Sequence, residues 1–431
     1  MSGPGARAIA LDVIRRVTEE GAYSNLALPR TLARAGLPER DAAFASELAY
    51  GTLRRLVPID HALGPLLDRP LDTAPKAARA LLRLGAYQIV YTRVPAHAAV
   101  AETVALAGPR HRGFVNAVLR RLAVEGTREP RGPSDRAVSL RTGLAAWAVH
   151  ELRELLGDAE EAARALAEPA RLTLRTNTCR VSVEELERAL ATEGVDVERG
   201  ALHAGSLSVA AGDPSRLPGF GQGWFAVQDQ ASSFVVDALD PRPGERVLDA
   251  CAGPGGKAGH VACRVRPGGV LVAADASPAR AGLVRRTLRR LGVDGHVLVQ
   301  DARRPAVAGP FDRVLVDAPC TGIGSARRRP ELLWRPRREE LGELSRLQAA
   351  IAIAAAGLLR PGGRLVYSVC TFPRAETDEV CEAILQARPD LQPEELPGPE
   401  GRSSRVRLWP HRHGCDAMFV AGFRRAPGRR G

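Results

Sequence analysis

From residue 244 onward, short apolar segments alternate with longer stretches of helical periodicity. In order, the apolar segments are ERVLDA, GVLVAADA, GHVLVQD, FDRVLVDAP, GGRLVYSVCT and DAMFVAGFRR. Strands that recur between helices favour a mostly parallel sheet with helices on both faces. This rhythm therefore predicts an α/β, doubly wound, Rossmann-like domain over residues 241–431.

Regions of a different texture precede that domain. Residues 1–125 show helical spacing of apolar side chains throughout and no strand-like alternation. Residues 126–136 are crowded with glycine, proline and charge, which is typical of a linker. Residues 137–240 mix helical stretches with alternating segments such as RLTLRTN. We therefore predict an all-helical domain, a linker and a small α+β domain ahead of the α/β domain.

The charge of the chain is strongly positive. The formal net charge is +12, and only two of the 61 basic residues, Lys76 and Lys257, are lysines. A surplus of arginine suits a polyanionic partner, because guanidinium groups bind phosphates bidentately and stack on bases. A genomic bias toward arginine would also raise this count, so charge by itself supports nucleic-acid binding only weakly.

The cysteines, at positions 179, 251, 263, 320, 370, 381 and 415, form no CxxC pair. An odd and scattered set predicts reduced thiols rather than a disulfide framework. There is no apolar segment of 18 residues and no apolar signal core, so we expect a cytoplasmic protein that does not enter a membrane. The residues HRHGC (411–415) lack a second cluster of ligand types, and we expect no metal site.

A glycine-rich turn follows the first strand of the α/β domain. It comprises Cys251, Ala252, Gly253, Pro254, Gly255, Gly256 and Lys257. Glycines let backbone N–H groups approach a ligand closely, and the N-terminus of the following helix favours anionic groups. Asp275 ends the next strand, where a carboxylate can accept hydrogen bonds from a ribose diol, and Asp301 ends the third. We predict a nucleoside cofactor site at these strand ends.

Two other nucleotide sites have related glycine patterns. Residues 253–258 formally satisfy GxGxxA, so the loop by itself is also compatible with a dinucleotide dehydrogenase. A P-loop would need glycine at 251 and serine or threonine at 258, where this chain has Cys251 and Ala258. The sequence therefore excludes a P-loop but not a dehydrogenase at this point.

Reactive side chains occur at the ends of the next two strands. Asp317 and Cys320 follow the fourth strand, and Cys370 follows the fifth. Ligands of open α/β sheets bind at the carboxyl ends of the strands, so these groups should converge beside the cofactor loop. A single cysteine is more often a small buried hydrophobe, but two at neighbouring strand ends favour thiol chemistry.

These motifs resemble those of a known enzyme family. DACAGPGGK, DAPCTGIG followed by RRRPELLW, and YSVCT are similar to motifs of the bacterial small-subunit rRNA cytosine-C5 methyltransferases known as RsmB, Sun or Fmu. Residues 1–125 resemble the NusB-like RNA-binding domain of that family, and FAVQDQAS (225–232) resembles the segment before its catalytic domain. The resemblance covers nearly the whole chain. It implies an S-adenosylmethionine-dependent enzyme that forms 5-methylcytosine in 16S rRNA.

The resemblance also implies which residues bind the cofactor. Residues 251–257 would form the S-adenosylmethionine loop, and Asp275 and Asp301 would contact the nucleoside part. Asp317 would lie where the cofactor and the target base meet. Ala258 departs from the threonine or serine that often follows the loop lysine, and DAMFVAGFRR departs from the commoner Asp-Gly-Phe-Phe pattern. Neither departure touches a catalytic position.

Covalent catalysis by two cysteines is a further implication of the resemblance. Cys370 would attack C6 of the flipped cytosine, and Cys320 would assist release of the enzyme. In the DNA cytosine methyltransferases the attacking thiol is instead the one in the Pro-Cys pair, which here is Cys320. Cys320 and water are both candidates for the base that removes the C5 proton. Lys257 is either a functional ammonium or simply exposed at a helix start.

A basic segment follows the DAPCTGIG motif closely. Basic residues with an interleaved aromatic fit phosphate neutralisation and base stacking, although Trp334 fits a core position equally well. The candidates for contact with 16S rRNA are Arg327, Arg328, Arg329 and Arg335.

We expect the protein to be a monomer. The rival interpretation, a non-catalytic RNA-binding factor, is suggested by residues 1–125 but leaves the strand-end thiols without a purpose.

Overall fold

The computed structural model describes residues 5–210 and 212–428, which fold into two compact units. The first unit extends to Pro169 and also contains Ala326–Pro336. The second consists of Ala170–Ser325 and the chain from Arg337 onward. Within the described ranges, no helix is both long enough and apolar enough to cross a membrane.

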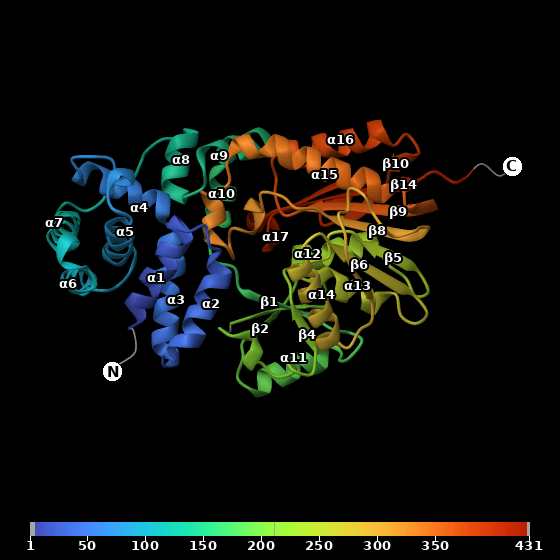
Figure 1. The fold of residues 1–431 in the computed structure, drawn as a ribbon, viewed down its shortest axis with the longest axis horizontal. Coiled ribbons are helices and arrows are strands. Elements are labelled where there is room, and N and C mark those ends of the chain that lie inside the picture. The colour runs from blue at the N-terminus through green and yellow to red at the C-terminus, as the bar shows by residue number, and fades with distance from the viewer. Residues whose placement is uncertain (1–4, 211, 429–431) are drawn as a thin grey trace. The chain divides into compact units, whose positions relative to one another are not determined.

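The first unit is built from helices alone (Figure 1). Its α-helices are α1 (Ala6–Glu19), α2 (Ser24–Ala35), α3 (Glu39–Arg54), α4 (Leu56–Leu63), α5 (Lys76–Tyr91), α6 (Ala96–Ala105), α7 (Pro109–Glu125), α8 (Asp135–Thr142), α9 (Ala146–Leu156) and α10 (Glu160–Ala167). Short 3-10 turns occur at Gly64–Leu66, Leu71–Thr73 and Pro330–Leu333. One core buries Val13 of α1, Leu48 of α3 and Leu82 of α5 completely. The expectation of helices without strands is confirmed for residues 5–125.

Helices α9 and α10 lie beyond the linker predicted for residues 126–136, and α8 begins inside it, at Asp135. We expected a small α+β domain to begin at residue 137, whereas the helical unit continues to Pro169. In that unit α8 contacts α4, α9 and α10, and each of the three helices α8, α9 and α10 buries one face. Helical periodicity shows that a helix has an apolar face but does not show which core that face joins. Residues 126–134, between α7 and α8, contain neither helix nor strand.

The segment Ala326–Pro336 is separated from the rest of the helical unit by the whole of the small α+β region and half of the α/β domain. Trp334 packs against the helical core and donates its indole N–H to the Leu53 carbonyl oxygen, over 2.9 Å. Glu331 is fully buried and accepts hydrogen bonds from the backbone N (3.1 Å) and the hydroxyl (2.6 Å) of Ser24. Trp334 is partly buried and packs against the core, which favours the interpretation of Trp334 as a core residue.

The second unit begins with a small α+β region. Its elements are β1 (Leu172–Thr176), α11 (Val183–Thr192), β2 (Val197–Arg199), β3 (Ser206–Val209), a 3-10 turn (Pro214–Arg216) and β4 (Phe225–Val227). The strands form an antiparallel sheet in the order β2-β3-β1-β4. A capping box starts α11, since the Ser182 hydroxyl accepts from Glu185 N and the Glu185 carboxylate accepts from Ser182 N. The alternating segment RLTLRTN is the strand β1, as predicted.

The rest of the second unit is the α/β domain. Its helices are α12 (Gln230–Leu239), α13 (Gly256–Arg264), α14 (Pro278–Leu291), α15 (Leu341–Ala356), α16 (Asp378–Ala387) and α17 (Pro410–His413), with 3-10 turns at Ile323–Ser325, Arg338–Glu340 and Arg374–Glu376. Its strands are β5 (Arg246–Asp249), β6 (Val270–Asp275), β7 (His296–Val299), β8 (Phe311–Asp317), β9 (Leu359–Val369), β10 (Leu391–Pro393), β11 (Leu396–Gly398), β12 (Gly401–Ser403), β13 (Arg405–Leu408) and β14 (Met418–Arg425). All six apolar segments of the sequence are strands, as predicted. The four short strands β10 to β13 had no clear sequence signal.

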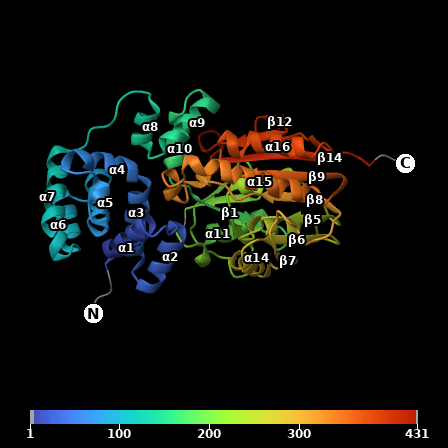
Figure 2. The same ribbon diagram turned by 45° about the horizontal axis from the view of Figure 1, so that its top comes forward.

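The large sheet has the order β10-β14-β9-β8-β5-β6-β7, with β13 beside β14. The strands from β9 to β7 are parallel, and β14 runs antiparallel to β9. Helices α12, α13 and α14 cover one face, and α15 and α16 cover the other (Figures 1 and 2). Alternate residues of a strand face opposite cores: Val247 packs with α12 and α13, and Leu248 packs with Ile351 of α15. The Rossmann-like fold is confirmed.

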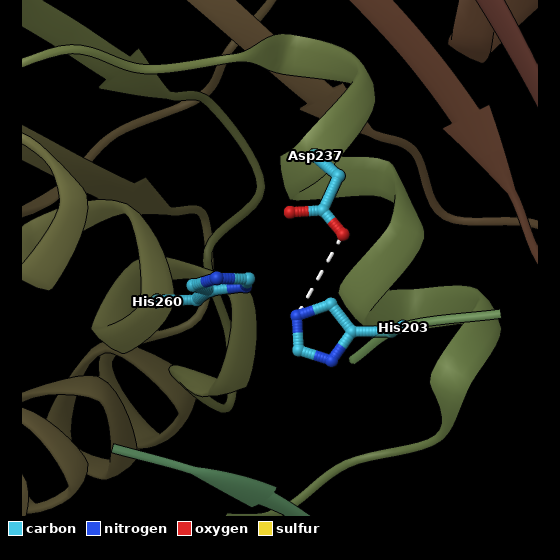
Figure 3. A group of neighbouring side chains, drawn as sticks. All are labelled: His203, Asp237 and His260. Carbon is cyan, nitrogen blue, oxygen red and sulfur yellow. Dashed lines mark ion pairs between the residues drawn. The ribbon is translucent and has the colours of Figure 1, made fainter. Parts of the chain in front are cut away.

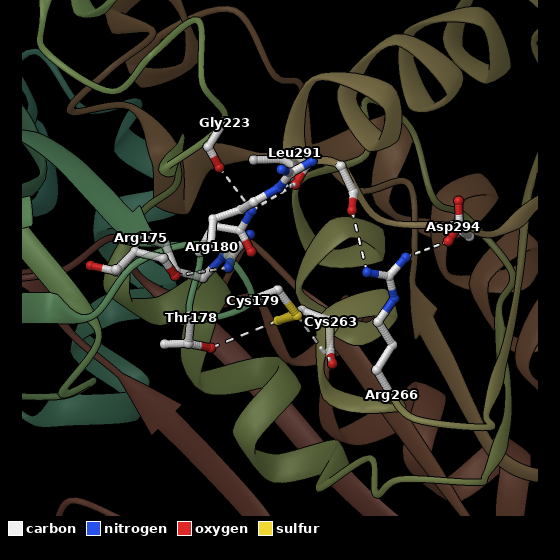
Figure 4. The surroundings of a disulfide bond; sticks show 12 residues. Arg175, Thr178, Cys179, Arg180, Gly223, Cys263, Arg266, Leu291 and Asp294 are labelled. Carbon is white, nitrogen blue, oxygen red and sulfur yellow. Dashed lines mark hydrogen bonds and ion pairs between the residues drawn. A yellow bond between two sulfur atoms is a disulfide. The ribbon is translucent and has the colours of Figure 1, made fainter.

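The prediction that all thiols are reduced is wrong for one pair. Cys179, after β1, is disulfide-bonded to Cys263 of α13, with Cα atoms 5.9 Å apart (Figure 4). The two residues are 84 positions apart, and the fold of the second unit brings them together. Neither has a neighbouring cysteine in the sequence, so spacing gave no signal for this pair.

Candidate active site

Parallel strands place the predicted site residues at one edge of the large sheet. β5, β6, β8 and β9 pair side by side in the same direction, so the loops after them begin next to one another. The register of β8 and β9 sets Asp317 beside Ser368, two residues before Cys370. The sheet thus brings the cofactor loop and both candidate thiols into one region.

The glycine loop has a backbone that side chains would disrupt. Gly255 has φ +108°, and a Cβ there would lie 2.9 Å from the Thr287 side chain. A Cβ at Gly253 would lie 2.4 Å from an oxygen of Asp275. Gly253 N instead donates a hydrogen bond of 3.0 Å to that carboxylate, and α13 begins at Gly256. The loop therefore presents the N-terminus of α13 and a close backbone path to a ligand.

The two predicted ribose-binding carboxylates have partners in their own loops. Asp275 accepts from Arg280 Nε at 3.0 Å and from the Ser277 backbone N at 2.9 Å. Asp301 is exposed and forms a bidentate pair with Arg303, which lowers the pKa of Asp301 to about 2. Both carboxylates are therefore paired with arginines whose side chains are more than half exposed, and Asp275 in addition contacts the cofactor loop through Gly253 N.

Asp249 is a buried carboxylate that sequence reasoning missed. It ends β5, is 1% exposed and accepts only a long hydrogen bond of 3.4 Å from Cys251 N. Its Oδ2 atom is buried and has no hydrogen-bond partner among the described residues. Burial, helped by the charge of Asp317, raises the pKa of Asp249 to about 7. An orphaned acceptor at the base of the glycine loop fits the donor groups of a nucleoside–amino-acid cofactor such as S-adenosylmethionine.

The two strand-end thiols lie against each other. Cys320 Sγ and Cys370 Sγ are 3.5 Å apart, both residues are partly exposed, and neither belongs to a disulfide. The contact with Cys370, together with burial, raises the pKa of Cys320 well above its ordinary value. The raised pKa favours the neutral form of Cys320, and the two sulfur atoms are within hydrogen-bonding distance.

An ion pair lies beside the thiols. Lys257 Nζ donates to Asp317 Oδ2 at 2.7 Å, and the Ser368 hydroxyl donates to Asp317 Oδ1 at 2.9 Å. Burial lowers the pKa of Lys257, but the charges of Asp317 and Cys370 outweigh this effect and leave that pKa raised. The Lys257 side chain is only 11% exposed, so the alternative of a lysine merely exposed at a helix start is wrong.

The four arginines predicted to contact RNA do not behave alike. Arg335 donates to the Val17 and Ala22 carbonyl oxygens, each at 2.8 Å, which gives its guanidinium a structural role in the helical unit. Arg335 is nevertheless partly exposed, and its contact with RNA stays a prediction. Residues 327–329 are partly exposed, and an RNA contact through them stays a prediction.

His203, Asp237 and His260 form a second titratable cluster that sequence reasoning missed (Figure 3). One ligand atom from each lies within 4.8 Å of the others, and His203 Nε2 is 3.6 Å from Asp237 Oδ2. Burial and the charges of Arg175 and Arg264 lower the pKa of His203 to about 4, and that of His260 is lowered as well. Two neighbouring guanidinium groups oppose a divalent cation. The cluster is better described as a buried pair of neutral histidines beside a carboxylate.

Models of three protein families match this chain. A 16S rRNA methyltransferase RsmB/F model matches residues 236–424, and the NusB family matches residues 4–124. An RsmF/B-like ferredoxin-like domain matches residues 144–213. That third match includes helices α9 and α10, which the structure groups with the helical unit.

Similarity to individual proteins extends over both units. The chain is 34% identical to the probable ribosomal RNA small subunit methyltransferase B of Bacillus subtilis, covering 99% of this chain and 100% of the relative. It is 35% identical to the ribosomal RNA small subunit methyltransferase B of Vibrio vulnificus, covering 96% and 98%. The protein PH0851, whose crystal structure is known, is 25% identical in sequence to this chain. Its structure superposes with a TM-score of 0.84 over 98% of this chain and 99% of that chain. A methyltransferase homologue from Pyrococcus horikoshii is 28% identical, with a TM-score of 0.60, over 68% of this chain and 100% of that chain.

Proposed function

Because this chain belongs to the RsmB/F family of 16S rRNA methyltransferases, we propose that it methylates C5 of a cytosine in 16S rRNA, with Cys370 as the nucleophile. The enzyme is an S-adenosylmethionine-dependent methyltransferase of small-subunit rRNA. One observation carries the choice of C5 chemistry: the thiols of Cys320 and Cys370 are 3.5 Å apart beside the Lys257–Asp317 ion pair.

Cytosine C5 is a poor nucleophile toward a methyl sulfonium. The enzyme must therefore activate the ring with a nucleophile of its own. Addition of a thiolate to C6 forms an S–C6 bond and makes C5 part of an enamine, which can take up an electrophilic methyl group. S-adenosylmethionine, when bound, supplies that group as a methyl sulfonium. A base then removes the C5 proton, and the electrons of that bond restore the C5–C6 double bond as the S–C6 bond breaks. Two thiols at adjacent strand ends suit attack and release as separate tasks.

The neighbouring charges fit this division of work. The Lys257 ammonium lies close enough to Cys370 for their charges to interact, so it would stabilise the thiolate that attacks. Asp317 holds Lys257 and faces the same region, where its carboxyl group can meet N3 of the target base. Cys320, held neutral, would lose its proton only when it or a nearby water takes part in release.

The remaining parts of the proposal concern partners. A NusB-like domain and a net charge of +12 support binding of 16S rRNA by the helical unit, with residues 327–329 as further contacts. The target base must leave its stack to reach the thiols, so a loop or bulge is the expected site. We expect the enzyme to act as a cytoplasmic monomer.

A dehydrogenase is the disfavoured alternative, because hydride transfer would give the paired thiols no role.

Covalent trapping tests the proposal. With 16S rRNA and S-adenosylmethionine, Cys320→Ala should attack and methylate but stall before release, leaving a protein–RNA adduct that survives denaturing electrophoresis. Cys370→Ala should form no adduct and transfer no methyl group. Cys381→Ala, a buried cysteine of α16, is the control and should form no stable adduct while keeping activity. Adducts with Cys370→Ala and none with Cys320→Ala would reverse the two roles.

A further inference from the structure

A buried carboxylate lies beneath both thiol loops. Glu376 ends the 3-10 turn Arg374–Glu376, six residues after Cys370, and its side chain has no solvent exposure. Neither the sequence motifs nor the chemistry proposed above uses this residue. A carboxylate that is fully buried must be satisfied by donors, and the identity of its donors shows what it holds.

Glu376 holds the peptide segment around Cys320. Its Oε1 atom accepts from the Thr321 backbone N at 2.9 Å, and its Oε2 atom accepts from the Thr321 hydroxyl at 2.6 Å. Gln348 of α15 donates to Glu376 Oε1 and to the Pro319 carbonyl oxygen, both at 2.9 Å. The residues directly before and after Cys320 are therefore tied to one buried pair of side chains.

The same carboxylate holds the segment after Cys370. Glu376 Oε2 accepts from the Thr371 hydroxyl at 3.2 Å, and the Thr371 and Thr321 hydroxyl oxygens are 2.7 Å apart. The Tyr367 hydroxyl, from β9, donates to the Glu376 carbonyl oxygen at 2.7 Å. Each cysteine is thus followed by a threonine whose hydroxyl meets the same carboxylate oxygen.

We infer that Glu376 is a positioning residue that holds the segments of Cys320 and Cys370 together and so sets the distance between the two thiols. The inference rests on the proposed function only for its catalytic consequence, because the hold of Glu376 on Cys320 can be measured without RNA. A network whose members are all satisfied and buried fixes geometry more firmly than separate hydrogen bonds do. Its negative charge also opposes ionisation of Cys320, in the same direction as burial and the contact with Cys370.

Glu376→Gln is the primary test variant, because it keeps the volume and removes the charge and one acceptor oxygen. Glu379→Gln is the matched control: the same substitution three residues along, at an exposed position. We expect Glu376→Gln to lower kcat for methyl transfer by about 10-fold to 100-fold while changing KM for S-adenosylmethionine by less than about 3-fold. The control should match the wild type in both parameters.

Thiol alkylation gives a readout that a purely structural role would not change. The pH dependence of iodoacetamide labelling at Cys320 is followed by peptide mass spectrometry in wild type, Glu376→Gln and Glu379→Gln. Removing a nearby negative charge favours the thiolate, so the labelling midpoint of Cys320 should move to lower pH in Glu376→Gln alone. Equal midpoints and equal kcat in the two glutamine variants would overturn the inference.

The two proposals can fail separately. If the wild-type enzyme methylated no 16S rRNA cytosine, the proposed function would fall, and the labelling midpoints would still decide whether Glu376 controls Cys320. If Glu376→Gln did not fold, Thr371→Val would replace it, since this nearly isosteric change removes the contacts of the Thr371 hydroxyl with Glu376 and with Thr321. We then expect kcat to fall by about 3-fold to 10-fold, and wild-type kcat in that variant would contradict the inference.

Discussion

Two parts of the site at the carboxyl edge of the large sheet are built in different ways. We call the glycine loop with Asp275 and Asp301 the cofactor side, and the two thiols with the Lys257–Asp317 ion pair the thiol side. On the cofactor side, Asp275 pairs with Arg280 of α14, five residues later, and Asp301 pairs with Arg303, two residues later. On the thiol side, the contacts are long-range: Lys257 reaches Asp317 across 60 residues, and the two cysteine loops meet across 50. The ion pairs of the first side join near neighbours in the sequence, whereas the fold brings together the distant residues of the second side.

This difference has a functional meaning. A carboxylate paired with an exposed arginine can exchange that partner for a ligand hydroxyl at small cost, because exposed ion pairs contribute little. Groups that perform covalent chemistry must instead be held in place before the substrate arrives. Substitutions on the cofactor side should therefore weaken binding by degrees, and substitutions on the thiol side should remove the reaction.

The largest effect is expected at Lys257. Lys257→Met removes the charge beside Cys370 and leaves Asp317 without its partner, so single-turnover methyl transfer should slow by about 100-fold or more. Lys76→Met is the matched control, since Lys76 is the only other lysine and its side chain is 70% exposed. A Lys257→Met rate within about 3-fold of wild type would show that the thiol side does not depend on this ion pair.

A smaller and graded effect is expected on the cofactor side. Asp275→Asn should weaken S-adenosylmethionine binding by about 10-fold to 100-fold, because the carboxylate is buried and holds the loop through Gly253 N. Asp301→Asn should weaken binding by only about 3-fold, because its carboxylate is exposed. Titration calorimetry of both variants measures the ratio. A larger loss at Asp301 would reverse the assignment of the main nucleoside contact.

The same contrast explains what could be predicted from the sequence. Strand positions follow from local alternation, so all six apolar segments and the convergence of Asp317, Cys320 and Cys370 at one edge were predictable. The glycine loop could also be predicted from the sequence, because the need for a positive φ at Gly255 is a local property. Where the role of a residue depends on its immediate neighbours in the sequence, the local sequence pattern predicts that role.

Long-range partners were not predictable in this way. The Cys179–Cys263 bond, the hydrogen bonds of Arg335 to the Val17 and Ala22 carbonyls and the place of Glu376 under two loops all join distant segments. Their residue types are compatible with many roles, and only the fold selects one. Asp249 is an intermediate case, since its position before the glycine loop was visible but its missing hydrogen-bond partner was not.

The smallest effect, and the one that tests the orphaned carboxylate, concerns stability at Asp249. Its pKa of about 7 in the folded protein lies above the unfolded value of about 3.9, so ionising it opposes folding progressively as pH rises from about 4 to 7. Asp249→Asn should therefore raise the free energy of unfolding by about 1–2 kcal/mol at pH 8, less than the full linkage because the amide also lacks a partner. The gain should shrink as pH falls from 7 toward 4.

Asp312→Asn is the control, and its effect should have the opposite sign. Asp312 lies near the start of β8, and its pKa is lowered rather than raised. Burial acts to raise that pKa, but hydrogen bonds from Arg246 N and Arg360 outweigh burial. Its ionised form therefore stabilises the fold, and the substitution should lower the free energy of unfolding at pH 8. Urea unfolding at pH 5 and pH 8 measures both variants. If Asp249→Asn gave the same change at both pH values, the carboxyl group would not titrate in this window, and Asp249 would not be the uncompensated acceptor that the cofactor side offers to its ligand.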